Sequence, residues 1–453
     1  MKWYAGGLVV LATFAACGGS PEGGDEATTS PTEALRFGRQ HHKADAGAPD
    51  ASADAAASGD AAASGDAGST SCIGSSLLQK LGRSRLLVGA TMADATAKAT
   101  PFDFRYLYIA GGLFDGSSVC SSCASGCTSN GVDCSGNGPG CGWWGCWQWD
   151  QQPPGQYLRD FFTTAAGDGQ IPMITYDTLL EASGVTEGTA EATQAATNVS
   201  FMTRYFADWR FVLQQIGTAR AFLHIEPDFW GYAQLASSDP HATAAVATAN
   251  PTDCASEENS IAGMGRCMIA MTRKYAPNAL VGLHASPWAT GVDVALNTST
   301  TLDVSAEAQK TASFLTACGA DVSDFVVVEA SDRDAGYYDT LGQSHWWDAT
   351  NQSLPSFHQD FAWLRAIAED TNQPLLDWQI PVGNMSLANT WNAWNDDRVD
   401  YFFAHMDELA AAHVFAVAFG AGAGGMTTPE TDGGNLVSKV SAYVSGGGQA
   451  LCP

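Results

Sequence analysis

Eight short hydrophobic runs, separated by longer amphipathic stretches, constrain the fold of this chain more than any other feature of its sequence. The runs predict β-strands because they are brief and rich in β-branched or aromatic residues. They are Leu86–Met92, Arg105–Ala110, Ile171–Tyr176, Ala221–Glu226, Leu280–Ala285, Phe325–Ala330, Pro374–Ile380 and Val414–Gly420. The stretches with helical spacing are Ala195–Ile216, Ser260–Tyr275, Ala306–Cys318, Phe357–Asp370 and Val399–His413.

A strand, a helix and a further strand, repeated at this spacing, predict parallel strands. Eight repeats within residues 72–453 predict a single domain of the α/β class, a (β/α)8 TIM-like barrel with an insertion after the second strand. An open doubly wound sheet is the alternative. The first run is not followed by a glycine-rich phosphate-binding fingerprint, so a dinucleotide-binding fold has little support.

The first 71 residues differ from the rest. Residues 1–17 hold one lysine, an apolar run and small residues before Cys17, which indicates a secretory signal because the run is too short to span a membrane. The segment Phe14-Ala15-Ala16-Cys17 resembles a bacterial lipobox, which implies cleavage before Cys17 and lipidation of its thiol. Simple secretion is the alternative, because Phe14 stands where leucine is usual. Residues 18–71 are rich in small and polar residues, and we expect a disordered tether.

The net charge of −27 limits the partners of the chain. It arises from 21 basic residues against 48 acidic ones, and the chain has no basic run. Phosphate backbones would be repelled, so we expect no nucleic-acid partner. We expect an exported monomer that touches the membrane only through a lipid on Cys17.

The chain has twelve cysteines, a number that favours disulfides in an exported protein. Six lie in the glycine-rich insertion after the second predicted strand, at Cys120, Cys123, Cys127, Cys134, Cys141 and Cys146. A zinc site there is the less favoured alternative, because only Cys120 and Cys123 have a ligand-like spacing. We further predict that Cys254 can pair with Cys267, that Cys72 can pair with Cys452, and that Cys318 is a free buried thiol.

Polar residues gather where the predicted strands end, which is where barrel enzymes carry their chemistry. They are Tyr176 and Asp177, Glu226 and Asp228, His284 and Ser286, Glu329, and Gln379. Side chains alternate between the two faces of a strand. The alternation predicts three pairs that face the barrel interior: His224 with Glu226, His284 with Ser286, and Asp377 with Gln379.

Glu226 and Glu329 end two strands of the same layout, each after a clean apolar run. Two carboxylates across a pocket are what glycosidic bond cleavage requires, one as the acid and one as the nucleophile or base. Asp228 is the third catalytic candidate, because a nearby like charge raises the pKa of a carboxyl group. Asp332 and Asp334 crowd the same area, and a salt-bridged turn around Arg333 is their alternative role. For the stretch Ala221 to Tyr232, a strand-capping acid beside core aromatics is the alternative to a sugar site.

Aromatic residues in the loops after the strands suggest a sugar site, because flat rings stack on the apolar faces of sugars. These aromatics are Trp143, Trp144, Trp147, Trp149, Trp230, Tyr232, Trp288, Tyr337, Tyr338, Trp346, Trp347, Trp391 and Trp394. A local cluster in the insertion is the alternative for Trp143–Trp149. The predicted substrate-binding residues are His224, Tyr176, Asp177, Trp230, Tyr232, His284, Trp288, Asp332, Asp334, Trp378 and Gln379.

Other chemistries have weaker signals. His224 and His284 could join Glu226 or Asp228 in a metal site, but the His-x-His opening of barrel metallohydrolases is missing, and we expect no metal or cofactor. Ser286 lacks the Gly-x-Ser-x-Gly context of a serine nucleophile. The segment 427–435 could close over a ligand or bind calcium.

At the level of layout, residues Ser84 to Gly434 resemble the secreted (β/α)8 glycoside hydrolases. In the largest clan of these enzymes the acid/base glutamate ends the fourth strand, which matches Glu226. That clan's nucleophile ends the seventh strand, where this chain has Trp378-Gln379-Ile380, so the nucleophile is not carried over. Other barrel glycosidases use the fourth and sixth strands, and Ile225-Glu226-Pro227-Asp228 resembles a stretch of the cellobiohydrolase and endoglucanase family numbered six.

Three hypotheses about function follow. The first is an extracellular glycoside hydrolase that cleaves a polysaccharide or oligosaccharide with a pair of carboxylates. The second is a surface lipoprotein that binds glycans without cleaving them, and the third is a metal-dependent hydrolase. A panel of glycans scored for both binding and turnover separates the first two, and chelation tests the third.

Overall fold

The computed structural model describes residues 72–110, 113, 128–129, 132–133, 155–185, 193–420 and 422–451. The signal segment at residues 1–17 and the tether at residues 18–71 lie outside these ranges and stay predictions. The six clustered cysteines and the tryptophans Trp143, Trp144, Trp147 and Trp149 also lie outside the described residues.

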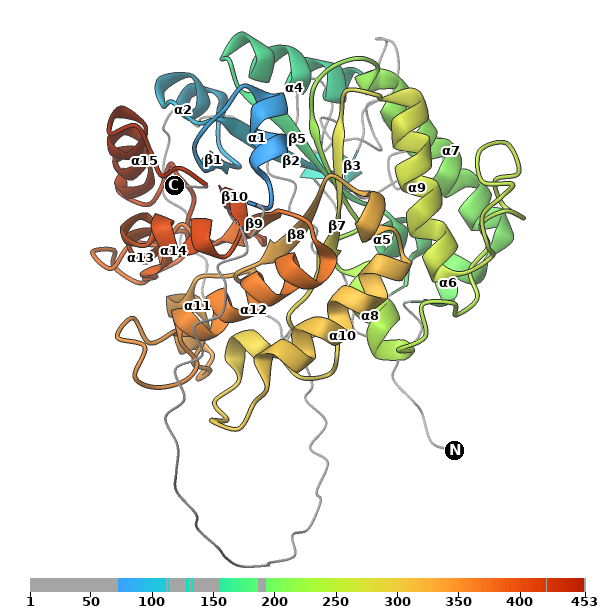
Figure 1. Ribbon diagram of the computed structural model, residues 1–453. Helices are drawn as coiled ribbons and strands as arrows, with labels where there is room; N and C mark the ends of the chain where they lie inside the picture. The colour runs from blue at the N-terminus through green and yellow to red at the C-terminus, as the bar shows by residue number, and fades with distance from the viewer. Residues whose placement is uncertain are drawn as a thin grey trace, which may run out of the picture. The chain divides into compact units, whose positions relative to one another are not determined.

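Eight parallel strands form a closed barrel (Figure 1). They are β1 (Leu87–Ala90), β2 (Phe104–Ala110), β5 (Ile171–Asp177), β6 (Phe222–Ile225), β7 (Leu280–Ala285), β8 (Phe325–Glu329), β9 (Leu375–Ile380) and β10 (Val414–Phe419). Their order around the ring is β1-β10-β9-β8-β7-β6-β5-β2. Each predicted run forms one strand, so the barrel prediction is confirmed and the open-sheet alternative is wrong. A short antiparallel pair, β3 (Thr128–Ser129) with β4 (Val132–Asp133), lies in the insertion between β2 and β5.

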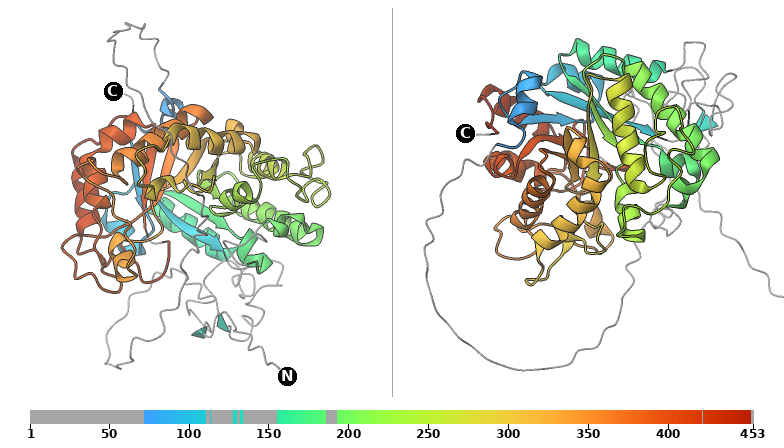
Figure 2. Two further views of the ribbon diagram at one scale, coloured as in Figure 1. Left: turned by 90° about the horizontal axis from the view of Figure 1, so that it is seen from below. Right: turned by 45° about the vertical axis from the view of Figure 1, so that its right-hand side comes forward.

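Helices surround the strands (Figures 1 and 2). In the described residues they are α1 (Ser75–Leu81), α2 (Asp94–Ala99), α4 (Gln156–Gly167), α5 (Leu179–Ser183), α6 (Gln194–Thr197), α7 (Val199–Ile216), α8 (Phe229–Ala236), α9 (Ile261–Tyr275), α10 (Val304–Ala317), α11 (Ala335–Thr340), α12 (Phe357–Thr371), α13 (Arg398–Ala404), α14 (Met406–Ala411) and α15 (Asn435–Ser445). Two 3-10 turns, η3 (Val294–Leu296) and η4 (Ala320–Val322), flank α10.

Two of the predicted helices are each split in two. The stretch 195–216 is divided at Asn198, whose extended backbone ends α6 and whose side chain accepts a hydrogen bond from Phe201 N at the start of α7. The stretch 399–413 is divided at His405, which leaves the helical conformation between α13 and α14. A hydrophobic pattern continues across such a cap because both helices bury the same side.

The barrel interior is filled by aromatic rings. Phe104, Phe222, Phe325 and Phe415 pack edge to face or tilted, with ring centroids 5.5–5.9 Å apart. Gly282 makes room for this layer, because a Cβ there would lie 2.6 Å from the Phe325 ring. The barrel is therefore a packed core, and polar chemistry is confined to the mouth at the carboxyl ends of the strands.

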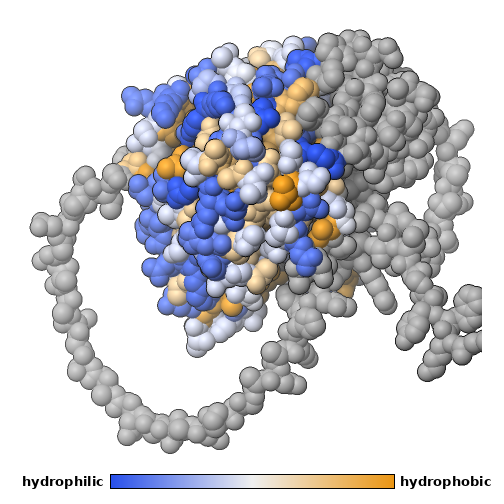
Figure 3. Space-filling view, turned by 90° about the vertical axis from the view of Figure 1, so that its right-hand side faces the viewer, coloured by the Kyte–Doolittle hydropathy of each residue, from blue (hydrophilic) through white to orange (hydrophobic). Residues whose placement is uncertain are grey.

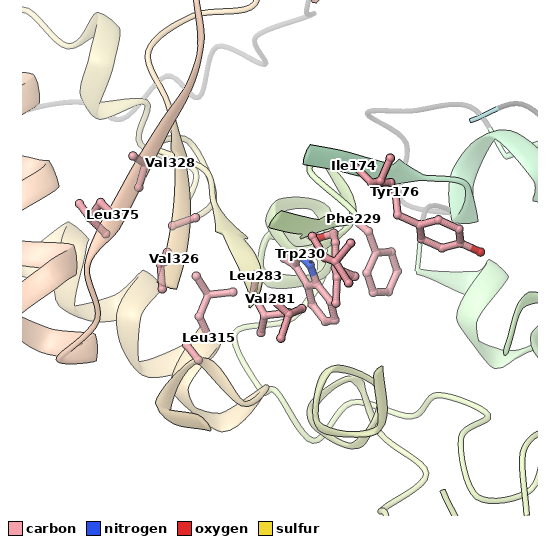
Figure 4. Packing of buried hydrophobic residues seen from close by; sticks show 14 of the residues in the cluster. Ile174, Tyr176, Phe229, Trp230, Val281, Leu283, Leu315, Val326, Val328 and Leu375 are labelled. Atoms are coloured by element: carbon pink, nitrogen blue, oxygen red, sulfur yellow. Dashed lines mark hydrogen bonds between the residues drawn. The ribbon is translucent and has the colours of Figure 1, made fainter. Parts of the chain in front are cut away.

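The opposite side chains of the strands pack against the helices. Val281 and Leu283 of β7, Val326 of β8 and Leu315 of α10 belong to one hydrophobic cluster (Figure 4). On the described part of the face in Figure 3, hydrophobic residues lie in small separate areas among hydrophilic ones. None of the described helices is both long and apolar enough to cross a membrane.

The described cysteines match the expectations for the barrel. Cys254 and Cys267 form a disulfide that ties the segment before α9 to the helix itself, with 5.4 Å between their Cα atoms. Cys318 is a free, buried thiol at the end of α10. Cys72 is disulfide-bonded, and its predicted partner Cys452 lies outside the described residues.

Candidate active site

Trp378 of β9 forms the floor of the barrel mouth. Its ring lies 5.8 Å from the Tyr108 ring, 4.7 Å from His224 and 5.7 Å from His284, measured between centroids. The side chain is 2% exposed, so it separates the phenylalanine layer below from the polar residues above. Its place in the interior agrees with its selection as a site residue, and a contact with substrate stays a prediction.

Three polar atoms at this floor are buried without a hydrogen-bond partner among the described residues. They are the Tyr106 hydroxyl of β2, the Ser286 hydroxyl after β7 and the Trp378 indole nitrogen. Buried polar groups are ordinarily paired with protein or water. Three unpaired ones at the same end of the barrel mark a place where a buried water can bind.

His224 and His284 form a buried pair under the mouth. His224 Nε2 lies 3.0 Å from His284 Nδ1, and His224 Nδ1 lies 3.3 Å from the Thr175 hydroxyl. Burial lowers the pKa of His284 to about 3, and burial together with the neighbouring His284 lowers the pKa of His224 well below its usual value. Both rings are therefore neutral at pH 7. Within the described residues, no group of three or more histidines, cysteines and acids is arranged to hold a metal ion.

Glu329 lies at the end of β8 on the interior face. Phe325, four residues earlier on that face, packs in the barrel interior, and strand alternation places Glu329 with it. The carboxylate is half-buried and accepts a 2.7 Å hydrogen bond from the Trp288 indole. Trp288 packs on Tyr232 with centroids 4.9 Å apart. Gly231 permits this contact, because a Cβ there would lie 2.5 Å from the Trp288 ring.

Asp177 and Asp228 are two further half-buried carboxylates at the mouth. Asp177 is the last residue of β5, and Asp228 follows β6. The pKa of the Tyr108 hydroxyl is raised well above its usual value, first by burial and then by Tyr106, with smaller contributions from Asp177 and Asp228. Both acids therefore lie within electrostatic range of Tyr108. Tyr108 was not among the predicted site residues, although the alternating tyrosines in Phe104–Ala110 were the signal that could have found it.

Glu226 does not share the mouth with Glu329, and the prediction that it faces the interior beside His224 is wrong. Its backbone is left-handed, with φ of 49°, which breaks the strand alternation. The fully buried carboxylate accepts a 2.8 Å bond from the Tyr205 hydroxyl of α7 and bonds from the backbone N–H groups of Thr178 and Leu179. Burial raises its pKa to about 8. Glu226 thus joins β6 to α7 and to the start of α5.

The predicted pairing of Asp377 with Gln379 on the interior face is also wrong, because Trp378 takes the interior face of β9 and alternation then turns Asp377 outward. Gln379 has φ of 57°, and its amide donates to the Tyr108 hydroxyl at the mouth. Asp377 points outward instead, where the charges of Asp360 on α12 and Arg398 on α13 act on it. It is fully buried, and burial raises its pKa well above the usual value.

Several predicted site residues have framework positions. Tyr176 donates a 2.8 Å bond to Asp208 on α7, and the indole of the buried Trp230 donates to Ile225 O. Asp334 is buried and accepts from the backbone of Gly383 and of Thr427, so it joins the loops after β8, β9 and β10. A substrate contact by any of these three residues stays an untested prediction.

Two other acids in the loops also have identifiable partners. Asp332 is exposed, accepts from the Tyr338 hydroxyl and pairs with Arg333 at 3.6 Å, as the salt-bridged turn predicted. In segment 427–435, Asp432 accepts from the backbone of Gly434 and Leu436 at the start of α15. This loop is therefore fixed to the framework by its own acid.

Comparisons with known proteins add a likeness in fold. No family model matches the chain, and no curated protein matches it. Similar solved structures include a modular endo-beta-1,4-mannanase from Cellulomonas fimi, of glycoside hydrolase family 26 (11% identity, 80% of this chain, 70% of that chain, TM-score 0.43). An endo-1,4-beta-D-mannanase from Thermotoga petrophila has 11% identity over 80% of this chain and 99% of its own, with a TM-score of 0.43.

The endoglucanase Cel6 from Mycobacterium tuberculosis has 14% identity and a TM-score of 0.29, over 50% of this chain. The matched part spans 57% of that endoglucanase. These structural neighbours are glycoside hydrolases, and the likeness at such identities is one of barrel architecture. The function of this chain is therefore argued from its own residues.

Proposed function

We propose that this protein is a glycoside hydrolase whose two reacting carboxylates are Glu329 and Asp228. The observation that carries the proposal is the half-buried Glu329 carboxylate, held by the Trp288 indole at the carboxyl end of β8. In barrels of this architecture the chemistry lies at that end of the strands. Glycosidic bond cleavage requires a second carboxylate beside the first.

Asp228 is the second carboxylate because of its place in the ring. It follows β6, and β6 and β8 are separated by β7 alone, so their backbones lie about 10 Å apart. Acids that lie at or just after the ends of two such strands can flank one glycosidic bond. A hydrogen bond from an N–H group favours the ionised form of a carboxylate. Glu329 is therefore the nucleophile or base, and Asp228 is the acid that protonates the leaving oxygen.

The floor of the mouth suits a sugar. The half-buried Tyr108 ring supplies apolar surface, backed by the buried Trp378 ring, and the half-buried Asp177 and Asp228 carboxylates supply hydrogen-bond acceptors. Sugars present both kinds of surface, since their C–H faces stack on aromatic rings and their hydroxyl groups need polar partners.

The test is turnover by the full chain and by Glu329→Gln and Asp228→Asn. Reducing-end release would be measured on soluble polysaccharides, namely galactomannan, hydroxyethyl cellulose and xylan. We expect release by the parent from at least one polymer and loss of it in both variants, with thermal unfolding unchanged. Asp407→Asn, at an exposed acid on α14, is the matched control. Full activity in Glu329→Gln would reject the assignment.

A non-catalytic glycan-binding barrel is the second candidate. The observation that favours it is the position of Glu226, because the acid at the end of the fourth strand is engaged by Tyr205 and the backbone. This candidate predicts retardation of the chain in a polysaccharide gel without any product. Product formation that depends on Glu329 excludes it.

We further propose that the chain is exported and carries a lipid on Cys17. The support is the apolar segment that ends in Phe14-Ala15-Ala16-Cys17. Expression in a bacterium supplied with labelled palmitate should label the full chain, and Cys17→Ser should abolish the label. A labelled Cys17→Ser chain would contradict the proposal.

A further inference from the structure

Trp391, in the loop between β9 and α13, is 60% exposed and is the most exposed large hydrophobic residue among the described ones. Exposure of a large ring to water is unfavourable, and a free loop would ordinarily fold it inward. The structure around Trp391 prevents this.

The turn that carries Trp391 is stiff. Asn389 and Asn392 have left-handed backbones, with φ of 56° and 60°. Thr390 and Ala393 exchange two backbone hydrogen bonds across the turn, of 3.1 and 2.8 Å. Asn395 N donates to the Asn389 side chain at 2.9 Å. Left-handed residues other than glycine persist only where the surroundings hold them, so the turn fixes the direction in which the indole projects.

A glycine loop supports one side of the indole. A Cβ on Gly425, in the loop after β10, would lie 2.4 Å from the six-membered ring of Trp391. The carbonyl oxygen of Gly425 also accepts from Asn392 N at 2.9 Å and from the Trp394 indole at 2.6 Å. Trp391 therefore rests on bare backbone on one side and faces solvent on the other.

The same glycine loop leads to the barrel mouth. A Cβ on Gly422 would collide with the Gln379 side chain, which donates to the Tyr108 hydroxyl. Gly422 and Gly425 are three residues apart, a span of at most about 11 Å. The two intervening residues are an alanine and a glycine, so this stretch of backbone carries no large side chain of its own.

We propose that Trp391 is an outer binding subsite that stacks on a sugar ring of a polysaccharide chain bound across the mouth. The proposal rests on the proposed function for the position of the polysaccharide at the mouth, but the binding of a sugar to Trp391 does not require cleavage. The net charge of −27 disfavours polyanionic glycans, so the ligand class is a neutral or amino-sugar polymer. Polymers should gain from this subsite, and short substrates that fill only the mouth should not.

The test compares Trp391→Ala and Trp391→Phe with Met385→Ala in the full chain. Met385 is 53% exposed in the same loop, so its truncation is matched for position and exposure. All three would be made in the Glu329→Gln background, and affinity would be measured by gel retardation in galactomannan, hydroxyethyl cellulose and xylan. We expect Trp391→Ala to weaken retardation about tenfold, Trp391→Phe to weaken it less, and Met385→Ala to leave it unchanged.

The outcomes separate this proposal from the proposed function. Binding that depends on Trp391 supports the subsite even where the parent releases no product, which would reject only the catalytic assignment. Unchanged retardation in Trp391→Ala overturns the subsite, whatever the activity. If none of the polymers retards the Glu329→Gln parent, the subsite proposal is also overturned. Thermal unfolding of each variant shows whether the fold is intact.

Discussion

Glu226 and Glu329 both end a predicted strand in the sequence, but they lie on opposite faces of the barrel wall in the structure. Each ends an apolar run. Glu226 follows β6, and Glu329 is the last residue of β8. Glu226 lies between the barrel and its helices, fully buried and engaged by Tyr205 and two backbone N–H groups. Glu329 lies half-buried at the mouth with the Trp288 indole on one oxygen.

The difference comes from one backbone angle. Glu226 adopts a left-handed conformation after β6, which turns its side chain to the outer face. Glu329 is the last residue of β8 and keeps the alternation of its strand. For the glutamate that ends an apolar run, strand alternation therefore predicts the interior face only if the backbone stays extended through that residue. The following predictions test this distinction, from the largest expected effect to the smallest.

Replacing Glu329 by glutamine should have the largest effect on activity. The amide keeps the shape of the side chain but can neither attack a sugar nor take a proton, so kcat/KM should fall about 10³-fold. Reducing-end release from a polymer that the parent cleaves measures the loss. Asp407→Asn should retain full activity, and an active Glu329→Gln would remove the distinction between the two glutamates.

Replacing Glu226 by alanine should act on stability instead. The change leaves Tyr205 and the N–H groups of Thr178 and Leu179 without their acceptor and opens a cavity, which should lower the free energy of unfolding by about 3 kcal/mol. Urea denaturation at pH 6 measures the loss. The milder Glu226→Gln should stay folded and active; if it folds but loses turnover, Glu226 is catalytic after all.

The pH dependence of stability should reveal the raised pKa values of the buried acids. Burial raises the pKa of Glu226 to about 8 and that of Asp360 to about 8. Below about pH 6.5 the buried neutral rings of His224 and His284 oppose this effect, because the unfolded chain binds protons there that these rings do not. Between pH 6.5 and 8 the unfolded chain has released the protons of Glu226 and Asp360, while the folded protein keeps them. The free energy of unfolding should therefore fall as pH rises through this window, by up to about 1.4 kcal/mol per pH unit for each group, and level off above about pH 8.

Urea denaturation at pH 6.5, 7.2 and 8 measures this slope. Glu226→Gln cannot ionise, so its slope should be smaller than that of the parent by the contribution of one group. A parent that becomes more stable between pH 6.5 and 8 would show that these acids are ionised in the folded protein.

Replacing Trp288 by phenylalanine should have the smallest effect. The ring still packs on Tyr232 and Gly231, but the hydrogen bond to Glu329 is lost. Since one hydrogen bond to a charged group contributes about 1.5–3 kcal/mol at most, and water can replace part of it, we expect kcat to fall about three- to tenfold. If the Trp288→Phe variant has the same kcat as the parent, the indole does not position Glu329.

Much of the fold could be predicted from the sequence. All eight strands were located because buried parallel strands are short continuous hydrophobic runs. The breaks at Asn198 and His405 were missed, since the hydrophobic pattern continues across them. At the mouth, the interior positions of His224 and His284 could be predicted. The position of Glu226 could not, because alternation says nothing about a change in the sign of φ, and the faces of Asp377 and Trp378 were exchanged, because the hydrophobic run of β9 does not fix the phase of its alternation.

The sequence by itself determined the barrel, the gathering of acids and aromatic rings at its strand ends, and the free thiol of Cys318, since each follows from composition and period. Only the tertiary structure decided which acids reach the mouth. It also decided that Asp334 connects three loops through hydrogen bonds, and that Trp391 packs on Gly425 and projects into solvent. These depend on single backbone angles and on contacts between loops far apart in the chain, and local residue patterns do not encode them.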